Sequence, residues 1–306
     1  MPYLFKVGLC MEKFETQVLN QNIVDWIKEF CKDKLGELEQ TGFLVNNLIR
    51  EDIFPMLDRF CTVVYYPIDD GINNGFHKTY LINGKKAHFV YINTNQDREK
   101  QIFTAAHELG HVWNLDKYIA DKLNTPIEYE FGERVMNRFA AELLMPYELF
   151  MKFVDEELDK LLRGSETASF QNIIQLITTI MNEFFVPYKS VVYRMYELKF
   201  ITEPHARILW GDHPNLSREL ITEYSKQYAK EQGYNRLYNP DKTKLIMGLK
   251  EDLDIAKKER LVPDQWALEF YKRFSLSPEE PNSALSAEID ITRGVDTNAA
   301  DESSCN

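Results

Sequence analysis

His107-Glu108-Leu109-Gly110-His111 is the stretch of this chain that constrains its fold and chemistry most strongly. In an α-helix, residues four apart lie on one face, so the two histidine rings would stand one turn above each other. That separation lets both imidazoles reach one tetrahedral Zn²⁺ ion, and Glu108 between them could take a proton from a water molecule at the metal. The stretch therefore predicts a helix that carries two ligands of a zinc site.

The residues around this stretch favour a buried helix. Asn95, Asp97 and Glu99 are capping and acidic residues typical of a helix start. Over residues 101–113 the apolar side chains recur at mixed three- and four-residue steps, which indicates a helix that is buried on most sides. Gly110 costs about 1 kcal/mol of helix propensity relative to alanine. A glycine there makes sense if another backbone packs closely against the helix.

A third ligand is expected on residues 132–146, which have the pattern of a second helix that ends at Pro146. Glu133 and Asn137 are four residues apart and share one face. Two histidines and a glutamate are an established ligand set for catalytic zinc, so we assign Glu133 as the third ligand. Asn137 would accept a hydrogen bond from the free ring N–H of a liganding histidine and fix its tautomer. Glu142 is the alternative ligand.

These two segments together resemble the ImmA/IrrE family of zinc metallopeptidases. The likeness is strongest over residues 63–146 and rests on the His-Glu-Leu-Gly-His motif, the downstream glutamate and the block Arg-Phe-Ala-Ala-Glu-Leu-Leu-Met-Pro. Carried over residue by residue, it implies one Zn²⁺ per chain, with three ligands and one general base: His107, His111 and Glu133, with Glu108. Many family members carry a helix-turn-helix repressor domain or act on a separate one. The first sixty residues here do not look like such a domain, which favours a separate substrate chain.

The rest of the pattern predicts an α+β fold. Helices are expected over residues 20–38 and 45–60, the second bent near Pro55. Three strand-like runs follow, at residues 62–68, 76–82 and 87–92. The dipeptide Asn83-Gly84 between the last two is a strong hairpin signal. We therefore expect a small antiparallel sheet before a zincin-like metal-binding helix and a second ligand helix, followed by a mostly helical C-terminal part.

The last strand before the metal-binding helix is a candidate for binding substrate. In His-Glu-x-x-His peptidases of known fold, an edge strand lies along the active-site cleft and pairs with the substrate backbone through main-chain hydrogen bonds. If residues 88–93 form that edge, the residues that would contact the substrate are His88, Phe89, Val90 and Tyr91. The alternative is that this strand lies in the middle of the sheet.

Helical apolar spacing dominates the chain beyond Pro146. Helices are expected at residues 147–162, 170–185, 189–200, 224–230, 245–258 and 266–274. The second and third of these, with the short turn between them, have the outline of a helix-turn-helix. We interpret this element as a packing or partner-docking unit, because Lys189, Arg194 and Lys199 are too sparse for a helix that reads DNA.

Four parts are expected along the chain. They are an N-terminal helical segment (1–42), a zinc metallopeptidase-like domain (43–150), a helical region with the helix-turn-helix-like element (151–275) and an acidic tail (276–306). The tail has too few apolar residues to offset the entropy of ordering, so we expect it to be disordered.

Composition limits the setting and the partners. The chain has 306 residues, 44% of them hydrophobic, and a formal net charge of −12. No stretch approaches the roughly 20 apolar residues that span a bilayer, and nothing resembles a signal peptide. The four cysteines form no Cys-x-x-Cys pair, so we expect free thiols in the cytoplasm. The negative charge disfavours nucleic acid and suits a basic protein partner, such as a DNA-binding repressor.

These patterns predict a zinc-dependent endopeptidase that acts on a specific protein substrate, in the narrowest form of the hypothesis a helix-turn-helix repressor. His77, His88 and Arg138 are candidates for a second donor to the developing oxyanion, and the sequence does not choose among them. The alternative function is a catalytically silent zinc-containing regulatory or docking protein. The intact Glu108 favours the enzyme, since a scaffold does not need that carboxylate. A DNA-binding regulator is a third hypothesis, disfavoured by charge.

Overall fold

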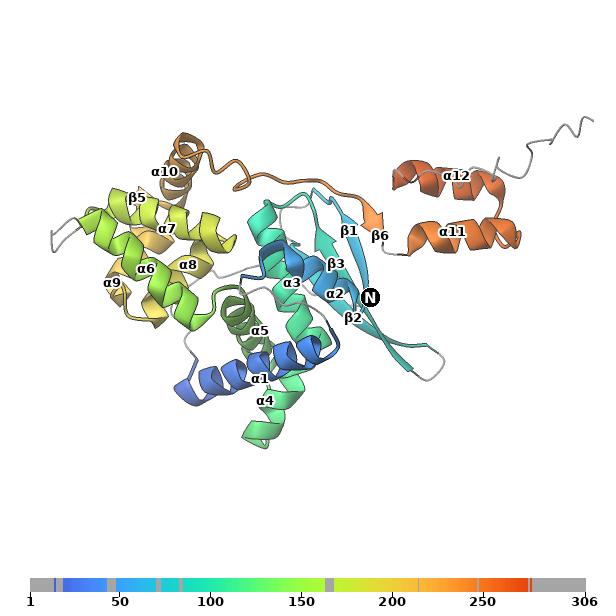
Figure 1. Ribbon diagram of the computed structural model, residues 1–306, viewed down its shortest axis with the longest axis horizontal. Coiled ribbons are helices and arrows are strands. Elements are labelled where there is room, and N and C mark those ends of the chain that lie inside the picture. The colour runs from blue at the N-terminus through green and yellow to red at the C-terminus, as the bar shows by residue number, and fades with distance from the viewer. Residues whose placement is uncertain are drawn as a thin grey trace, which may run out of the picture. The chain divides into compact units, whose positions relative to one another are not determined.

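The computed structural model of this chain describes Phe14 and residues 19–42, 48–69, 73–82, 85–162, 168–213, 215–246, 248–274 and 276. The chain divides into two compact units, Met1–Leu249 and Lys250–Asn306. The first unit holds the sheet and the helices up to α10 (Figure 1). All residues predicted for the metal site belong to this unit.

A four-stranded mixed sheet with strand order β2-β3-β1-β6 forms one part of the first unit. Its strands are β1 (Thr62–Tyr66), β2 (Gly75–Ile82), β3 (Lys85–Asn93) and β6 (Leu245–Ile246). β2 and β3 form an antiparallel hairpin, whereas β1 runs parallel to β3, with Val64 opposite Tyr91. β6 comes from far along the chain and pairs antiparallel with β1.

The α+β class is confirmed, but two expectations for the sheet are wrong. The sheet is mixed rather than antiparallel, because the chain leaves β1, crosses to β2 and returns on β3, which places β1 parallel to β3. The strand that contains residues 88–93 is not an edge, because β2 and β1 flank it on both sides. It lies mid-sheet, as the alternative had it, and the edge strands are β2 and the two-residue β6. The expected substrate contacts relied on an edge position that this strand does not have. They stay a prediction for four residues, His88, Phe89, Val90 and Tyr91.

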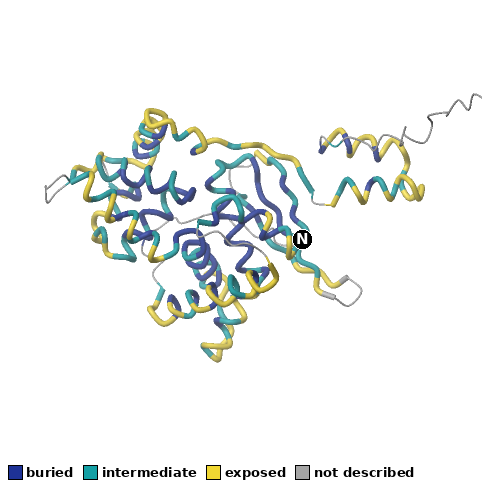
Figure 2. The backbone as a smooth tube through the Cα atoms, viewed as in Figure 1, coloured by how far each residue is buried: buried dark blue, intermediate teal, exposed yellow. Residues whose placement is uncertain are grey.

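The helix that carries the His-Glu-x-x-His motif is α3 (Arg98–Val112). It contacts β2 and β3, and it also packs against α2 (Ile53–Asp58) and α5 (Tyr129–Leu144). Its backbone is buried along most of its length, as Figure 2 shows. The predicted burial on most sides is therefore confirmed, and it places the motif in the core of the first unit.

Two further helices border this core. The N-terminal helix α1 (Gln21–Gln40) is capped by Asn20, whose side chain accepts a hydrogen bond from the Asn22 N–H. The second expected helix is shorter than predicted. It consists of a 3₁₀ turn, η2 (Arg50–Asp52), followed by α2. Pro55 falls in the first turn of α2, where a missing N–H costs little, so it does not bend a longer helix. Residues 43–47 and the Asn83-Gly84 turn lie outside the described residues.

The helices after Pro146 pack together within the first unit. They are α6 (Tyr147–Leu162), α7 (Phe170–Phe184), α8 (Tyr188–Glu197), α9 (Glu203–Trp210) and α10 (Arg218–Glu231). Ser169 and Ser217 cap α7 and α10 with their hydroxyls. A short ladder of β4 (Asp212–His213) and β5 (Leu216–Ser217) joins α9 to α10. Predicted helices at residues 147–162 and 170–185 are confirmed to within one residue.

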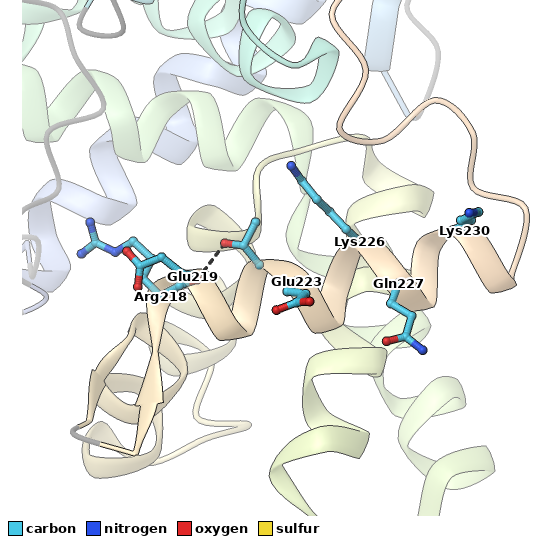
Figure 3. A pocket seen from close by; sticks show the side chains of 7 residues that line it. Arg218, Glu219, Glu223, Lys226, Gln227 and Lys230 are labelled. Atoms are coloured by element: carbon cyan, nitrogen blue, oxygen red, sulfur yellow. Dashed lines mark hydrogen bonds between the residues drawn. The ribbon is translucent and has the colours of Figure 1, made fainter.

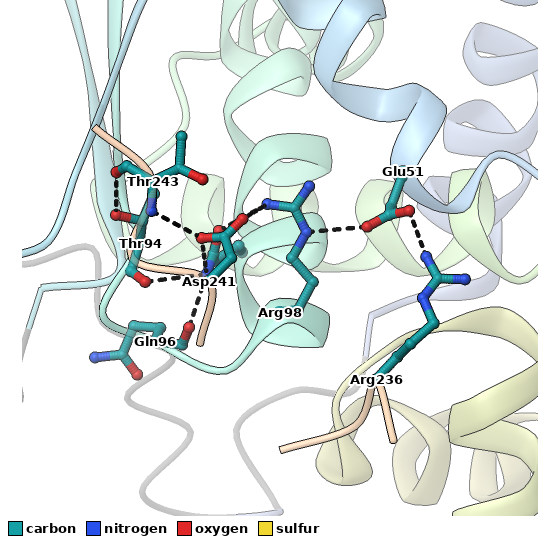
Figure 4. A network of polar contacts seen from close by, with 8 residues as sticks. Glu51, Thr94, Gln96, Arg98, Arg236, Asp241 and Thr243 are labelled. Carbon is teal, nitrogen blue, oxygen red and sulfur yellow. Dashed lines mark hydrogen bonds and ion pairs between the residues drawn. The ribbon is translucent and has the colours of Figure 1, made fainter. Parts of the chain in front are cut away.

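A segment that follows α10 runs back to the sheet and ends in β6. Arg98 at the start of α3 holds it, with one guanidinium nitrogen 2.5 Å from Asp241 and another 3.1 Å from Glu51 (Figure 4). The Thr94 hydroxyl donates to the Thr243 carbonyl at 2.6 Å. The expected helix over residues 245–258 therefore begins as a strand, because pairing with β1 overrides its helical pattern.

The second unit consists of two helices, α11 (Leu249–Lys258) and α12 (Asp264–Arg273). Leu253, Ala267 and Tyr271 are its buried side chains within these helices. None of the helices in the described parts of the chain is both long enough and apolar enough to cross a bilayer. The expected disordered tail falls almost entirely outside the described residues.

Candidate metal centre

Three of the predicted side chains converge between α3 and α5. The Nε2 atom of His107 lies 3.3 Å from Glu133 Oε2, and the Nε2 atom of His111 lies 3.5 Å from Glu133 Oε1. The three potential ligand atoms all lie within 4.8 Å of one another. Within the described ranges, no other group of three or more histidine, cysteine or acidic side chains meets this condition. The predicted cluster is therefore confirmed as a geometric arrangement.

A glycine on α3 lets α5 come close enough to deliver Glu133. A Cβ atom on Gly110 would lie 2.7 Å from the Met136 sulfur and 3.0 Å from a ring carbon of Phe139, both on α5. Gly110 was expected to accommodate a neighbouring backbone, but the neighbours are side chains. The close approach brings the first turns of α5 against the end of the motif helix.

A second glycine brings β2 against the same helix. A Cβ atom on Gly75 would lie 2.5 Å from the Thr104 methyl carbon, 2.6 Å from the Tyr91 carbonyl oxygen and 3.7 Å from Glu108 Oε1. Because one of these neighbours is backbone, only glycine fits without a shift of the strand. The edge strand therefore lies directly beside Glu108.

Asn137 orients one of the histidine rings. Its Oδ1 atom lies 2.9 Å from His107 Nδ1. An amide oxygen only accepts, so Nδ1 carries the proton and the lone pair of the ring lies on Nε2, the atom nearest Glu133. This Nε2 atom is buried and has no hydrogen-bond partner among the described residues. The geometry matches the arrangement predicted for a histidine that binds a metal through Nε2.

Glu108 is fully buried, and neither of its carboxylate oxygens has a hydrogen-bond partner among the described residues. Burial raises its pKa and the Glu133 carboxylate adds to the rise, while the two histidines oppose it. Burial alone also lowers the pKa of His107, but the neighbouring Glu133 and Glu108 carboxylates outweigh it and the net shift is upward. The two carboxylates therefore favour the protonated, positively charged form of the His107 ring.

The donor set fits a divalent cation. A buried carboxylate without a partner costs several kcal/mol, and a cation held at the cluster would offset much of that cost. Two imidazole nitrogens and one carboxylate oxygen are an established set for Zn²⁺, which leaves further coordination positions open. The orphaned Nε2 atom of His107 supports this fit independently of the motif.

The sequence of residues 59–196 matches the family model of the M78 peptidases, the IrrE N-terminal-like domain. This match includes both helices of the cluster and every residue of the His-His-Glu set. Residues 59–196 form an IrrE N-terminal-like domain. The resemblance inferred from the motifs is thereby confirmed, and the match extends about fifty residues beyond the segment that carried it.

Other comparisons add little to the IrrE-like assignment. A Mycobacterium tuberculosis transcriptional regulator is similar in structure at 18% sequence identity, with a TM-score of 0.34, over 60% of this chain and 48% of that protein. The chain thus spans about half the length of that regulator, and the likeness is too distant to carry an argument. The comparison with curated proteins gave no match.

Glu142 of the IrrE-like domain, the alternative third ligand, does not join the cluster. Its carboxylate pairs with Arg138 at 2.9 Å and with Arg194 at 3.0 Å. Arg138 also pairs with Glu197 at 2.6 Å and is 4% exposed in its side chain. Two of its three guanidinium nitrogens, Nε and Nη2, are therefore held in this buried ionic cluster, which makes Arg138 a poor candidate for an oxyanion donor.

His77 and His88 extend the row of imidazoles away from the cluster. The His77 ring stacks on the His111 ring with centroids 5.9 Å apart, and its Nε2 atom lies 2.8 Å from His88 Nδ1. Burial, followed by the positive charge that His111 and His88 could carry, lowers the pKa of His77 to about 4. His77 is therefore a neutral ring beside the site, and one of its nitrogens is occupied by His88.

Tyr129 lies beside the cluster and was not selected as a candidate from the sequence. It is the first residue of α5, four positions before Glu133, and it is 51% exposed. Partial burial and then the nearby Glu133 and Glu108 carboxylates raise its pKa to about 12. The four-residue spacing to Glu133 was the available signal, since it puts both side chains on one helical face.

A surface hollow of about 720 Å³ lies along α10, outside the IrrE-like domain. Figure 3 shows that its lining side chains all come from this one helix, and they carry both signs of charge. A hollow bordered by a single helix is open to water and gathers no catalytic groups. The His-His-Glu cluster is the better candidate for the functional site.

Proposed function

We propose that this protein is a zinc-dependent endopeptidase that hydrolyses a peptide bond in a specific protein. The observation that carries the proposal is Glu108. Its carboxylate is fully buried beside the two histidines of the cluster, yet the cluster is complete without it. A site that only stored or sensed metal would have no use for a second acidic group at this position.

His107, His111 and Glu133 would hold the metal, and Glu108 would move the proton. Bound Zn²⁺ supplies Lewis-acid chemistry and makes water acidic enough to ionise near neutral pH. Glu108 would accept the proton of the attacking water and then deliver it to the leaving amine nitrogen. Its raised pKa suits both steps, because a base that must later act as an acid works best with a pKa closer to neutrality.

Tyr129 is our choice for the second donor to the developing oxyanion. Its phenol keeps its proton at neutral pH and is partly open to solvent, and its hydroxyl, which hydrogen-bonds Glu133 in this structure, would turn to the substrate once Glu133 binds the metal. His77 is the less suitable donor, because it spends one nitrogen on His88. His88 lies one residue further from the cluster in this row of rings.

The substrate would be a protein segment that pairs with β2. Since β3 is enclosed by its neighbours, β2 offers the free backbone edge, and Gly75 at its start lies beside Glu108. The family resemblance favours a separate DNA-binding repressor as this substrate. Cys31 and Cys61 are free thiols, which suits the reducing cytoplasm that we propose as its location.

The helix-turn-helix-like element is proposed as a packing unit and not as a DNA reader. Arg194 of α8 is fully buried and ion-paired, so it cannot reach a phosphate. The Lys189 ammonium lies over the Trp210 ring at 4.7 Å. Two of the three basic residues considered for DNA contact are therefore engaged within the protein.

Substitution of the proposed base tests the function against the alternative of a silent zinc protein. Extracts treated with the zinc-loaded protein should gain new protein N-termini, which terminal-amine profiling by mass spectrometry detects. The Glu108→Gln variant should keep its metal and produce none of them. The matched control is Glu223→Gln, an exposed carboxylate on α10, which should leave the new termini unchanged. New termini that persist with Glu108→Gln, or none with the parent protein, would favour the silent alternative.

A further inference from the structure

The β2–β3 hairpin carries a charge opposite to that of the whole chain. Between Gly75 and Ile92 the sequence contains three lysines, Lys78, Lys85 and Lys86, and no acidic residue, whereas the chain has 48 acidic and 36 basic residues. We call the outer half of this hairpin, residues 78–82 and 85–88, the basic arm. Its charge sets it apart from the surface of an acidic protein.

The basic arm continues directly from the metal centre. Alternate residues of β2 point to one face of the sheet, so Thr79 and Leu81 lie on the same face as Gly75 and His77. Gly75 lies beside Glu108, and His77 stacks on His111, in the last turn of α3. Thr79 and Leu81 therefore lie beyond the end of that helix, on the same sheet face as the site.

The outer part of the arm is open to solvent. Leu81 is 75% exposed and Tyr80 is 55% exposed. Figure 1 shows the hairpin reaching past the helices of the first unit, and residues 79–81 and 86 are exposed. β2 is also an edge strand, so one row of its backbone N–H and C=O groups has no strand partner among the described residues.

Positive charge on the arm reaches the row of histidines. Lys86 lies opposite Leu81 in the ladder, and Thr79 lies opposite His88. Burial and then the Lys86 ammonium lower the pKa of His88, which places that ammonium within electrostatic range of the ring. By the same alternation Lys86 lies on the sheet face of the metal centre and Lys78 on the opposite face, so an anionic group on the site-facing side of the arm would meet the attraction of Lys86.

The border of the metal centre at the start of α5 carries negative charge, opposite to the charge of the basic arm. Glu128 and Glu130 flank Tyr129 at the start of α5, and both are exposed. α3 contacts both α5 and β2, so the acidic and the basic borders belong to different neighbours of the same helix. An acidic peptide segment would be attracted to the arm and repelled at α5. This difference favours binding of an acidic segment on the side of the arm.

We propose that the basic arm binds an acidic, extended segment of the protein substrate, paired to the free edge of β2 and located to one side of the bond that is cut. The inference rests on the proposed peptidase function and adds a substrate class to it. A polypeptide suits the arm better than a nucleic acid, since a strand edge offers a regular row of backbone hydrogen bonds to another strand. The exposed Leu81 and Tyr80 would contact apolar side chains of the same segment.

An array of immobilised twelve-residue peptides of random sequence tests the proposal. The probe is the full chain, loaded with zinc and carrying Glu108→Gln, so that it binds without cutting. Retained peptides should be enriched in Asp and Glu. Adding Lys78→Glu and Lys86→Glu should abolish the enrichment and weaken binding of the best acidic peptides by about tenfold. Adding Lys152→Glu and Lys230→Glu, two exposed lysines on α6 and α10, makes the same change in net charge and should leave the enrichment intact.

Backbone pairing is tested with the same probe. A retained acidic peptide with N-methyl groups on alternate amides loses its donors to one strand edge, so its binding should fall by about tenfold or more. Equal binding of the methylated peptide would contradict pairing with β2.

Three outcomes of the array would overturn the proposal: no retained peptides, no acidic enrichment, or enrichment that survives the arm substitutions. Single-stranded oligonucleotides on the same array that bind more tightly than any peptide would reassign the arm to nucleic acid. The readout needs no cleavage, so it is separable from the peptidase test. If no proteolysis is found but acidic enrichment depends on the arm, the proposed peptidase function would be wrong, whereas binding of acidic segments by the arm would be supported.

Discussion

Two carboxylates with opposite environments lie within the same cluster. Burial raises the pKa of Glu133, but the imidazoles of His107 and His111 outweigh burial and hold it well below its usual range. The same two histidines also lower the pKa of Glu108, but burial and the Glu133 carboxylate outweigh them, so its pKa is raised. When two acidic groups of one site are separated in this way, the one with the lowered pKa suits a permanent ligand and the other suits proton transfer. The division of roles thus follows from environment as well as from the motif.

Removing the Tyr129 hydroxyl should slow cleavage without affecting the metal. If the phenol donates to the developing oxyanion, Tyr129→Phe should lower kcat by about 10- to 100-fold at nearly constant KM. Zinc content should stay at one ion per chain. Steady-state kinetics on a substrate peptide identified from the new N-termini would measure this, with Tyr224→Phe, another exposed tyrosine, as the control. An unchanged kcat would remove Tyr129 from the catalytic site.

Substitution of Gly110 should disturb the metal centre through packing alone. In Gly110→Ala the new Cβ meets Met136 and Phe139 of α5, so overpacking of about 1–3 kcal/mol opposes a gain of about 1 kcal/mol in helix propensity. Displacing α5 should also weaken zinc binding, because Glu133 moves with it. Gly36→Ala in α1 has open space around its Cβ and should only stabilise. Urea unfolding and a chelator competition would measure both effects; equal behaviour of the two variants would contradict the packing argument.

Glu99 should make stability fall as pH rises. It is 1% exposed at the start of α3, and burial followed by Asp97 raises its pKa from 4.5 to about 7. Between these values the folded chain keeps a proton that the unfolded chain has lost, so stability declines from about pH 4.5 to about pH 7. Glu99→Gln mimics the protonated form. It should match the parent at pH 4 and be more stable by about 1–3 kcal/mol at pH 8. Urea unfolding at both pH values measures the difference, and no gain at pH 8 would contradict it.

At the scale of elements, local patterns predicted the helices well and the sheet connectivity poorly. α3, α5, α6 and α7 have long apolar stripes and clear ends, so periodicity alone located them. α4 (Leu115–Leu123) and α9 were missed because both are short. Left-handed caps mark α4, at Asn114 and Asn124.

β6 and the order of the strands could not be predicted from local sequence. β6 is two residues long and exists because a distant segment, held by Arg98 and Thr94, pairs with β1. The position of β3 depends on where the chain crosses after β1, and no local pattern encodes that crossing. The convergence of His107, His111 and Glu133 was predicted because the motif spacing fixes faces on two neighbouring helices. Their binding of zinc stays a prediction.

The buried ionic cluster between α5 and α8 should be the costliest polar contact to break. Arg194 is fully buried and bridges Glu142, Glu197 and the Met145 carbonyl at 2.7 to 3.0 Å. Arg194→Met leaves two largely buried carboxylates, 11% and 19% exposed, to share Arg138, so unfolding free energy should fall by about 3–5 kcal/mol.

A surface pair provides the comparison for that loss. Arg207 pairs with Glu203 at 2.8 Å, but both side chains are partly exposed. Arg207→Met should therefore cost less than about 1 kcal/mol. Urea unfolding of both variants measures the contrast, and similar losses would show that burial of the cluster adds nothing.

At the scale of the whole molecule, the metal centre depends on the first unit alone. All side chains of the cluster, the buried ionic cluster and the basic arm lie before Lys250. A chain ended after Leu249 keeps β6 on the sheet, so it should fold and bind one zinc ion with unchanged affinity. Circular dichroism and metal analysis would measure this. Loss of the metal in the shortened chain would show that residues 250–306 contribute to the site. The four parts expected from sequence stay a prediction.

The distribution of charge is a second property of the whole molecule. A net charge of −12 suggested a basic partner, yet the hairpin beside the metal centre is basic. Net charge acts at long range and is screened within about 10 Å at ordinary ionic strength, whereas the arm acts at contact distance. The two can operate together if the substrate is a basic protein with an acidic extended segment. Charge composition alone could not predict the arm, because the lysines matter only when the strands bring them beside the site.

Zinc K-edge X-ray absorption of the loaded protein would test the central claim most directly. We predict two imidazole nitrogens and a carboxylate oxygen at about 2.0–2.2 Å, with no sulfur at about 2.3 Å. Glu133→Ala should remove the protein oxygen, and Glu108→Gln should leave the spectrum nearly unchanged. A spectrum with sulfur, with a single imidazole, or with a first shell that changes in Glu108→Gln but not in Glu133→Ala would contradict the assignment of ligands and base.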